Sequence, residues 1–338
     1  MKQLSIIVPT YNMERYLSKC LSSMIIENLN LFNELEVAVI IDGSTDNSVE
    51  IAKSFQEKYP NVFRVFEKEN GNYGSCINYG LKKITGKYVK IIDADDSVDN
   101  NQFEAYLSFI RKCDTDVILS DYRLVNEEGC SICVKNRTLP TNIPLSWDEV
   151  ISSFNVDMHV AMHELTYKTS VLTRSDYCQT ENISYTDQEW IFYPMAHVDT
   201  FISSGINIYN YLVGREGQTM DIRSVKKNVS AHLKIALRML DFLCEKQNRL
   251  VVNSYLETNF KWLLEYTYKI YLSFQIGSNN NDLKEFDLLL SNKKPKIHNL
   301  LNFSEMRILK TKYKYIKKWR ENGYTKTLRL KLLSIYNG

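Results

Sequence analysis

Blocks of apolar residues alternate with helical patterns through the first hundred residues of the chain. Short apolar runs, rich in β-branched residues, predict buried strands at 4–9, 35–41, 62–67 and 87–92. Between these runs, apolar residues recur at helical spacing over 14–26, 48–59 and 72–84. Strands that alternate with helices of this length predict βαβ units and a mostly parallel sheet. We therefore expect an α/β fold with helices flanking the sheet.

The pattern changes twice further along the chain. A helix is predicted over 101–112 and a strand over 115–125, after which residues 126–222 look irregular and rich in loops. Helical spacing returns from about residue 225. We expect one α/β domain over 1–222, with halves at 1–100 and 101–222, and an α-helical C-terminal region over 223–338.

Composition indicates an ordinary globular protein. The 338 residues are 44% hydrophobic and 24% charged, and no apolar run approaches the roughly 18 residues of a membrane span. The start, "MKQLSIIVPTYN", leads into a polar loop rather than a signal-peptide cleavage site. Cys130 and Cys133 have no second pair that would complete a zinc site, so we expect reduced thiols and a cytoplasmic location.

Charge is distributed unevenly along the chain. Residues 293–338 contain 13 Lys and Arg but only 2 Asp and Glu, which indicates a polyanionic partner. Within this tail, residues 310–333 mix basic and aromatic residues, a pattern typical of a helix on an anionic membrane surface. Nucleic acid would give a similar charge pattern, but we do not expect it as a partner. The alternative is a solvated helix packed against the acidic body of the protein.

Three carboxylates follow the last strand of the first hundred residues. Asp93, Asp95 and Asp96 lie in "IIDADDS" (91–97), and Asp42 follows the strand at 35–41. Ligands of parallel sheets bind beyond the carboxyl ends of the strands, and grouped carboxylates favour a hard divalent cation, Mn²⁺ or Mg²⁺. The alternative is an acidic turn that caps the following helix.

Four motifs extend this interpretation. "VPTYN" (8–12) and "IIDGSTDNS" (40–48) follow the first two strands, and the segment 69–96 ends in "IIDADD". In this order and spacing, residues 1–125 resemble the family-2 glycosyltransferases, which have the GT-A nucleotide-sugar fold and invert the configuration of the transferred sugar. The resemblance implies that 1–100 binds the nucleotide and 101–222 the acceptor.

The same resemblance implies roles for individual residues. Pro9, Thr10, Tyr11 and Asp42 would hold the base, a uracil, and Asn78 and Gly80 would shape the nucleotide wall. Asp93 would contact the ribose or donor sugar, Asp95 would bind the metal, and Asp96 would lie beside it at the donor sugar. The chain departs from the family at Cys76 and Ile77, where members usually carry Ala or Arg before the Asn. Contacts from those two side chains are therefore not carried over.

The transfer also needs a base for the acceptor hydroxyl. Family members commonly carry Glu-Asp at the start of a helix, where this chain has Thr186 and Asp187 in "ENISYTDQEW". We predict Asp187 as the base, with Glu189 as the second candidate; the alternative is that Thr186 or Asp187 only caps the helix.

Two further groups of polar residues stand out. "YNYLVGREGQTMD" (209–221) resembles a loop that closes over the donor diphosphate in members that build polysaccharides, with Arg215 and Gln218 as its contacts; the alternative is a surface turn. His159 and His163 have helical spacing, and for them we expect a structural or acceptor-lining role rather than a metal site.

Together these features predict a metal-dependent, inverting glycosyltransferase. We expect a nucleotide-sugar donor, UDP-linked, and a lipid-linked glycan acceptor of a bacterial surface polysaccharide, at the inner face of the membrane. Two alternatives stay open: a glycan on a protein, and a non-catalytic module that binds nucleotide sugars. A nucleotidyltransferase is disfavoured because no glycine follows the first strand, and a dinucleotide oxidoreductase because no G-x-G-x-x-G is present.

Overall fold

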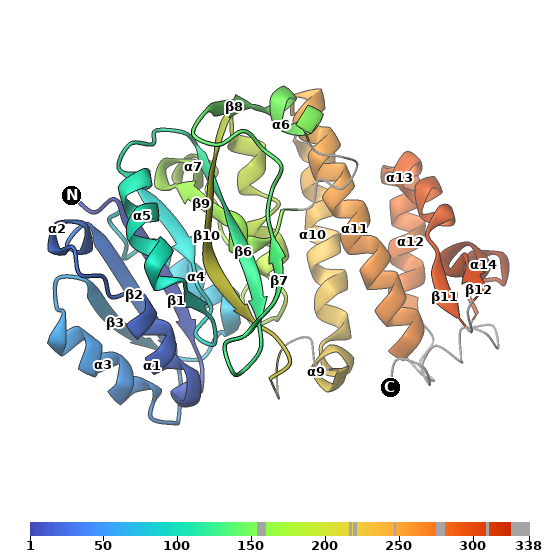
Figure 1. The fold of residues 1–338 in the computed structure, drawn as a ribbon. Coiled ribbons are helices and arrows are strands. Elements are labelled where there is room, and N and C mark those ends of the chain that lie inside the picture. Colours follow the sequence, from blue (N-terminus) through green and yellow to red (C-terminus); the bar gives the residue numbers. More distant parts are fainter. Residues whose placement is uncertain are drawn as a thin grey trace. The chain divides into compact units, whose positions relative to one another are not determined.

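A computed structural model describes residues 1–153, 160–215, 218, 222–246, 248–274, 281–308 and 311–325. The chain forms two compact units, Met1–Arg215 and Glu216–Gly338, which are described separately (Figure 1). The domain boundary that the sequence places at residue 222 stays a prediction.

The first half of the sheet is parallel, as predicted. Its strands are β1 (Leu4–Thr10), β2 (Leu35–Asp42), β3 (Phe63–Lys68) and β4 (Tyr88–Ile91), in the order β3-β2-β1-β4. All residues of β1 and β2 are buried, because helices cover both faces of a parallel sheet. In the parallel pairing Thr10 lies beside Ile41, so the loops after β1 and β2 emerge together.

The helices of this half pack on opposite faces of the sheet, against alternate residues of β1. α1 (Glu14–Ser23) and α3 (Ser48–Lys58) supply Leu17 and Ala52 to a core that also contains Ile6 and Val8 of β1. α4 (Asn72–Leu81) packs on the opposite face, against Ile7. Different helices therefore pack against the two faces of β1.

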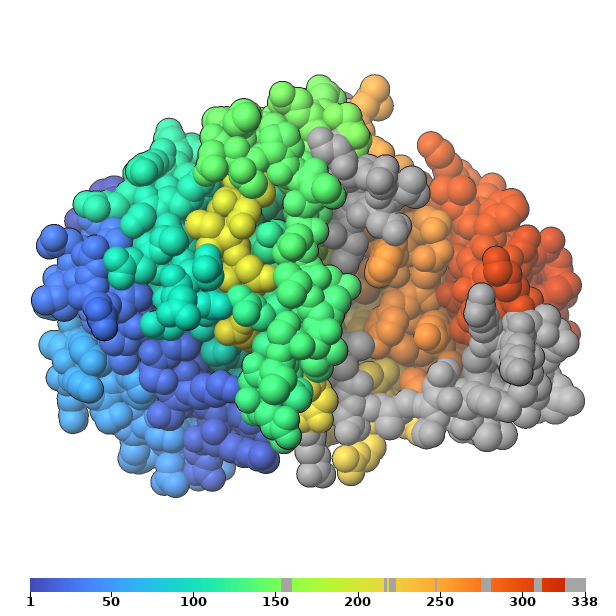
Figure 2. Space-filling view, viewed as in Figure 1, coloured from blue at the N-terminus to red at the C-terminus, as the bar shows by residue number. Residues whose placement is uncertain are grey.

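The second half of the sheet is mixed. The sheet continues as β4-β9-β6-β10-β5, in which β9 (Leu165–Lys168) is antiparallel to both neighbours and β6 (Val117–Val125) is parallel to β10 (Thr200–Leu212). The short strand β5 (Ser97–Val98) pairs with the end of β10 and precedes α5 (Asn100–Ile110). β10 appears in yellow in Figure 2, between the teal surface of α5 and the green surface that includes β7 (Ser131–Lys135).

The expectation that 126–222 is irregular is wrong in part. Besides β7, β9 and β10, the segment contains β8 (Pro144–Ser146), α6 (Trp147–Ser153), α7 (Thr169–Arg174) and α8 (Asp187–Trp190). The 13-residue strand β10 escaped prediction because its sequence, "TFISSGINIYNYL", places Ser, Gly and Asn inside the strand. Its register against β6 shifts between Ser203 and Asn207, and such bulges break the period-2 pattern.

The second unit is mainly helical, as predicted. It contains α9 (Ile222–Lys227), α10 (Val229–Glu245), α11 (Leu250–Phe274), α12 (Asn281–Lys293), α13 (Pro295–Leu300) and α14 (Tyr315–Glu321). A single helix over 310–333 is wrong, because Thr311–Tyr313 forms β12, which pairs with β11 (Met306–Ile308). Residues 326–338 of the basic tail lie outside the described part. Among the described helices, none is both long and apolar enough to span a membrane.

Candidate functional site

Two residues predicted to hold the base meet at neighbouring strand ends. Tyr11 follows β1 and is 50% exposed, whereas Pro9 and Thr10 belong to the buried strand. Asp42, the last residue of β2, is buried, and its Oδ1 accepts hydrogen bonds from Lys68 Nζ at 2.6 Å and from the Gly71 N–H at 3.0 Å. Lys68 balances the Asp42 charge, and contacts of Tyr11 and Asp42 with a base stay predictions.

Asn78 and Gly80 occupy packing positions in α4. Asn78 Nδ2 donates to the Gln179 carbonyl at 2.9 Å and to Glu181 Oε1 at 2.8 Å, and its Oδ1 accepts from the Gln179 N–H. A Cβ atom at Gly80 would lie 2.8 Å from Ile7 Cγ2. The structure thus ties Asn78 to the segment 179–181 and Gly80 to β1, and a contact of either residue with the nucleotide stays a prediction.

The three aspartates after β4 have three different environments. Asp93 Oδ1 accepts from the Tyr73 hydroxyl at 2.9 Å. Asp95 Oδ2 lies 2.6 Å from Arg215 Nε. Asp96 is 2% exposed and accepts from the Tyr209 hydroxyl at 2.6 Å and from the Leu212 N–H at 2.7 Å. Asp96 is therefore a buried anchor for the end of β10, and its predicted contact with the donor sugar stays a prediction.

Burial and mutual repulsion raise the pKa of two carboxyl groups of this cluster, Asp93 and Asp96. Burial raises the pKa of Asp93 to about 7, with a further contribution from the charge of Asp95. Burial also raises the pKa of Asp96 well above its usual range, and the charges of Asp95 and Asp93 add to the effect. A cation placed among these carboxylates would favour their charged forms.

The cationic partner of the cluster comes from far along the chain. Arg215 follows β10, 120 residues after Asp95, and its guanidinium carbon lies 5.3 Å from the centre of the Tyr16 ring. The nearest cation in the sequence, Lys90, donates instead to the His163 carbonyl at 2.6 Å. Only the pairing of β10 beside β5 brings Arg215 to the acid cluster. Gln218 belongs to the second unit, so its predicted contact with the diphosphate stays a prediction.

The two candidate bases, Asp187 and Glu189, have different environments. Asp187 opens α8 and lies close enough to Asp93 and Tyr73 for its charge to raise the pKa of both groups. Burial raises the pKa of Asp187 itself. Glu189 is fully buried and accepts from the Thr180 N–H at 2.6 Å and the Thr180 hydroxyl at 2.7 Å. Glu189 therefore fixes the segment before α8, whereas Asp187 borders the acid cluster.

The side-chain oxygen of Thr186 turns away from a capping role. Its hydroxyl donates to Gln179 Oε1 at 3.1 Å and makes no cap on α8, whereas the Asp187 carboxylate accepts from backbone N–H groups at the start of the helix. The alternative of a simple N-cap at Thr186 is therefore not what the described structure shows.

An aromatic group around His163 was missed by the sequence analysis. The His163 ring lies 4.4 Å from the ring of Tyr211, 4.6 Å from Tyr209 and 5.2 Å from Tyr122, measured between centroids. Burial lowers the pKa of His163 to about 3, so its ring is neutral. These tyrosines lie on β6 and β10, and no local pattern links them to His163. His159 falls outside the described residues.

The donor set fits a hard divalent cation. One ligand atom from each of Asp93, Asp96 and His163 falls within a 4.8 Å cluster, and Asp95 adds a carboxylate beside them. Mg²⁺ and Mn²⁺ take carboxylate oxygens and complete their shell with water or phosphate. Asp96 already accepts two hydrogen bonds and Asp95 pairs with Arg215, so binding of the metal by Asp95 stays a prediction.

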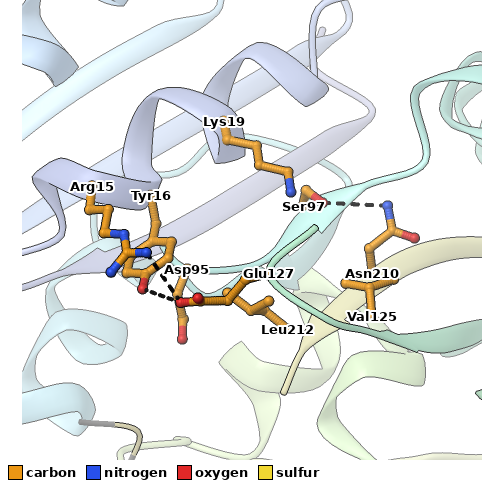
Figure 3. Close-up of a pocket in the computed structure, with 9 residues that line it drawn as sticks. All are labelled: Arg15, Tyr16, Lys19, Asp95, Ser97, Val125, Glu127, Asn210 and Leu212. Atoms are coloured by element: carbon orange, nitrogen blue, oxygen red, sulfur yellow. Dashed lines mark hydrogen bonds and ion pairs between the residues drawn. The ribbon is translucent and has the colours of Figure 1, made fainter. Parts of the chain in front are cut away.

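A pocket of about 170 Å³ lies against Asp95. Figure 3 shows Arg15, Tyr16 and Glu127 gathered at one end with Asp95, and Lys19, Ser97 and Asn210 at the other. Arg15 pairs with Glu127 at 3.5 Å, and the Tyr16 hydroxyl donates to the same carboxylate at 3.1 Å. The pocket therefore joins α1 and the ends of β6 and β10 to the acid cluster.

Comparison with known proteins identifies the relatives of this chain. Residues 5–137 match the model of the family "Glycosyl transferase family 2". YibD, an uncharacterized glycosyltransferase of Escherichia coli K12, is 40% identical over 115 residues, which cover 34% of this chain and 32% of YibD. TarS, a poly(ribitol-phosphate) beta-N-acetylglucosaminyltransferase of Staphylococcus aureus, is 27% identical over 221 residues, 65% of this chain and 37% of TarS. The matched segments thus span well under half the length of these curated relatives.

The likeness extends to the fold. The crystal structure of residues 1–349 of S. aureus TarS in complex with UDP-GlcNAc covers 95% of this chain and 92% of its own, with a TM-score of 0.63 and 19% sequence identity. At this identity the comparison shows the fold. Residues 5–137 are therefore similar to glycosyl transferase family 2, and the fold is GT-A-like, as in TarS.

Proposed function

We propose that this chain transfers a sugar, with inversion, from a UDP-sugar to a hydroxyl group of a surface-polysaccharide acceptor carried on a lipid. One observation carries the proposal: Asp93, Asp95 and Asp187 lie close enough for their charges to interact beyond the carboxyl end of β4, and Asp42 ends β2 at the same edge of the sheet, where an α/β sheet binds its ligands. Similarity to the family alone would support only the fold, whereas this arrangement supports the chemistry.

The relatives suggest the kind of donor and acceptor. TarS is named for N-acetylglucosaminyl transfer to poly(ribitol-phosphate), and its crystal structure contains UDP-GlcNAc. GgaB of Bacillus subtilis, 38% identical over 105 residues, is named as a minor teichoic acid biosynthesis protein, and the match covers 12% of GgaB. A UDP-sugar and a cell-wall polymer are therefore the first donor and acceptor to test.

In this proposal, Asp187 acts as the general base. Its carboxylate accepts the proton of the acceptor hydroxyl while the hydroxyl oxygen forms a bond to the anomeric carbon. The bond from that carbon to the diphosphate breaks, and its electron pair leaves with the diphosphate. Attack from the opposite face in a single displacement inverts the anomeric centre.

The departing diphosphate needs positive charge. Asp95 and Asp93 would hold Mn²⁺ or Mg²⁺, which supplies Lewis acidity to the diphosphate when bound. Arg215 pairs with Asp95 at 2.6 Å, and its planar guanidinium suits phosphate oxygens equally well. We propose that Arg215 exchanges this carboxylate for the diphosphate when the donor binds.

Calorimetric titration with UDP, with and without Mn²⁺, tests the nucleotide site. We expect Mn²⁺ to strengthen binding, and Asp95→Ala to weaken the Mn²⁺-dependent part by about tenfold or more, a loss of roughly 1.4 kcal/mol. Glu57→Ala removes an exposed carboxylate from α3 and serves as the matched control. An affinity for UDP that changes neither with Mn²⁺ nor with Asp95→Ala would mean that the acid cluster is a structural turn.

A screen of UDP-sugars for hydrolysis and transfer separates the alternatives. Turnover with a lipid-linked or polyol-phosphate acceptor supports the proposal. Turnover only with a glycosylated protein would show that the acceptor is a glycan on a protein. A chain that binds UDP with Mn²⁺ but turns over no donor would be a non-catalytic binding module.

A further inference from the structure

The second unit carries exposed apolar side chains on a strongly basic background. Residues 216–338 contain 23 Lys and Arg and 11 Asp and Glu, a net charge of +12, whereas residues 1–215 carry a net charge of −10. Trp262 is 46% exposed, Leu300 42% and Phe303 68%. Large apolar side chains at this exposure mark interaction surfaces when they gather in one place.

Contacts around Glu265 bring these side chains together. Glu265 Oε1 accepts from the Ser304 hydroxyl at 2.6 Å and pairs with Lys261 at 2.7 Å. Trp262 precedes Glu265 by three residues on α11, so both lie on the same side of the helix. Phe303 precedes Ser304 directly. The hydrogen bond between Ser304 and Glu265 therefore links the segment that carries Phe303 to the helix that carries Trp262.

Two more residues complete the group. Lys314 Nζ lies 5.2 Å from the centre of the Phe303 ring, and the Tyr315 hydroxyl ties the same segment to the Glu265 carbonyl at 2.8 Å. Leu300 ends α13, three residues before Phe303. We call Lys261, Trp262, Leu300, Phe303 and Lys314 the aromatic–basic patch.

We propose that the aromatic–basic patch docks the second unit onto an anionic lipid surface. Tryptophan and phenylalanine bury their rings at the boundary between headgroups and acyl chains, and lysine stems reach from the same depth to lipid phosphates. The net charge of the unit complements an anionic leaflet, where each lysine adds to binding. A soluble polyanion such as an acceptor polymer would need the cations but would leave Trp262, Leu300 and Phe303 in water. The observations therefore favour lipid.

The docking surface is then formed by residues of α11 and α13 together with Phe303 and Lys314, and not by a single helix over 310–333. It does not depend on the proposed sugar transfer, because no residue of the patch belongs to the first unit.

Flotation of the full chain with vesicles tests the proposal. We expect binding to vesicles that contain phosphatidylglycerol, and little binding to phosphatidylcholine alone. Phe303→Ser and Trp262→Ser should each weaken binding several-fold, and Lys314→Glu should weaken it about fivefold or more. Leu250→Ser, at an 89% exposed leucine outside the patch, is the matched control and should bind as the unaltered chain does.

Three outcomes would overturn the proposal. They are absence of binding at low salt, equal loss in Leu250→Ser, and binding that is unchanged in both aromatic variants but displaced by polyphosphate. The last result would assign the surface to a soluble polyanion. Thermal unfolding confirms that each variant folds, and UDP titration of the same samples reports the donor site separately, so failure of one proposal is distinguishable from failure of the other.

Discussion

At the scale of single residues, the environment of Asp187 differs from that of its neighbour Glu189. The Glu189 carboxylate accepts hydrogen bonds from the N–H and hydroxyl of Thr180, so Glu189 has a structural role. Asp187 accepts a hydrogen bond from Gln188 Nε2 at 3.1 Å, and it borders Asp93. Both are acids in one turn of helix, but only Asp187 faces the cluster.

We predict that Asp187→Asn abolishes transfer without loss of folded structure. Removing a general base lowers rates by roughly 10²- to 10⁴-fold. Because burial raises the Asp187 pKa, the ionised form is disfavoured in the folded state, so the neutral amide should not lower the unfolding temperature. Steady-state transfer and thermal melts of the same samples check this expectation.

Glu189→Gln is the control for Asp187→Asn. Gln cannot accept both Thr180 hydrogen bonds through its nitrogen, so we expect lower stability but no specific loss of the chemical step. Equal activity of Asp187→Asn and the unaltered chain would remove Asp187 from the mechanism.

The same raised pKa predicts a pH dependence. A base must be deprotonated to act, so activity should fall as the pH decreases through the pKa of Asp187. Since that pKa lies above the usual value of 3.8, the acid limb of the kcat/KM profile should lie above the range of an ordinary aspartate. An acid limb at or below pH 3.8 that persists in a fully folded sample would contradict this assignment.

At the scale of elements, Gly80 allows α4 to pack closely on β1 in the parallel half of the sheet. A Cβ atom at Gly80 would meet three atoms of the Ile7 side chain between 2.8 and 3.1 Å away. Ile7 is fully buried in the centre of the sheet, so it has little room to move. The glycine therefore sets the distance between helix and strand.

We predict that Gly80→Ala destabilises the first unit by about 1–3 kcal/mol, the usual range for overpacking a core. Ser18→Ala, at an exposed position of α1, is the matched control and should change stability little. Chemical denaturation of both variants measures the difference. A gain in stability for Gly80→Ala would show that helix propensity outweighs the contact with Ile7.

At the scale of the whole molecule, each compact unit has its own interior. The second unit closes around Asp287, which is fully buried and lies 2.5 Å from both Arg320 Nη2 and the Tyr268 hydroxyl, and 3.3 Å from His298 Nε2. These four side chains join α11, α12, α13 and α14. Burying such a charge is tolerable only while its partners remain.

We predict that Arg320→Ala destabilises the second unit by about 3–5 kcal/mol, because it leaves the Asp287 charge buried without its main partner. UDP binding should persist, since the predicted donor residues Tyr11, Asp42, Asp93 and Asp95 lie in the first unit. Lys317→Ala removes an exposed cation from the same helix, α14, and is the control. Loss of UDP binding together with the second unit would mean that the two units fold as one.

The sequence by itself determined the parallel half of the sheet, its helices and the position of the acid cluster. Those features depend on residues close in the chain: apolar periodicity defines β1 to β4, and strand ends place Asp42 and Asp93. The predicted roles of Tyr11, Asp95 and Asp187 come from the resemblance of local motifs to the family, and these roles stay predictions. Local patterns carry this information because hydrogen bonding and side-chain direction within one element repeat with a fixed period.

Tertiary structure decided the rest. Arg215 meets Asp95 and Tyr209 meets Asp96 only because β10, more than a hundred residues after β4, joins the sheet. The tyrosines of β6 and β10 surround His163 through the same pairing. The bulged strand β10 has no clear period, so the sequence did not reveal its partners. The segments that carry Trp262 and Phe303 are likewise linked through Glu265 and Ser304. Contacts between distant segments depend on pairing and packing, and no spacing along the chain records which surfaces will meet.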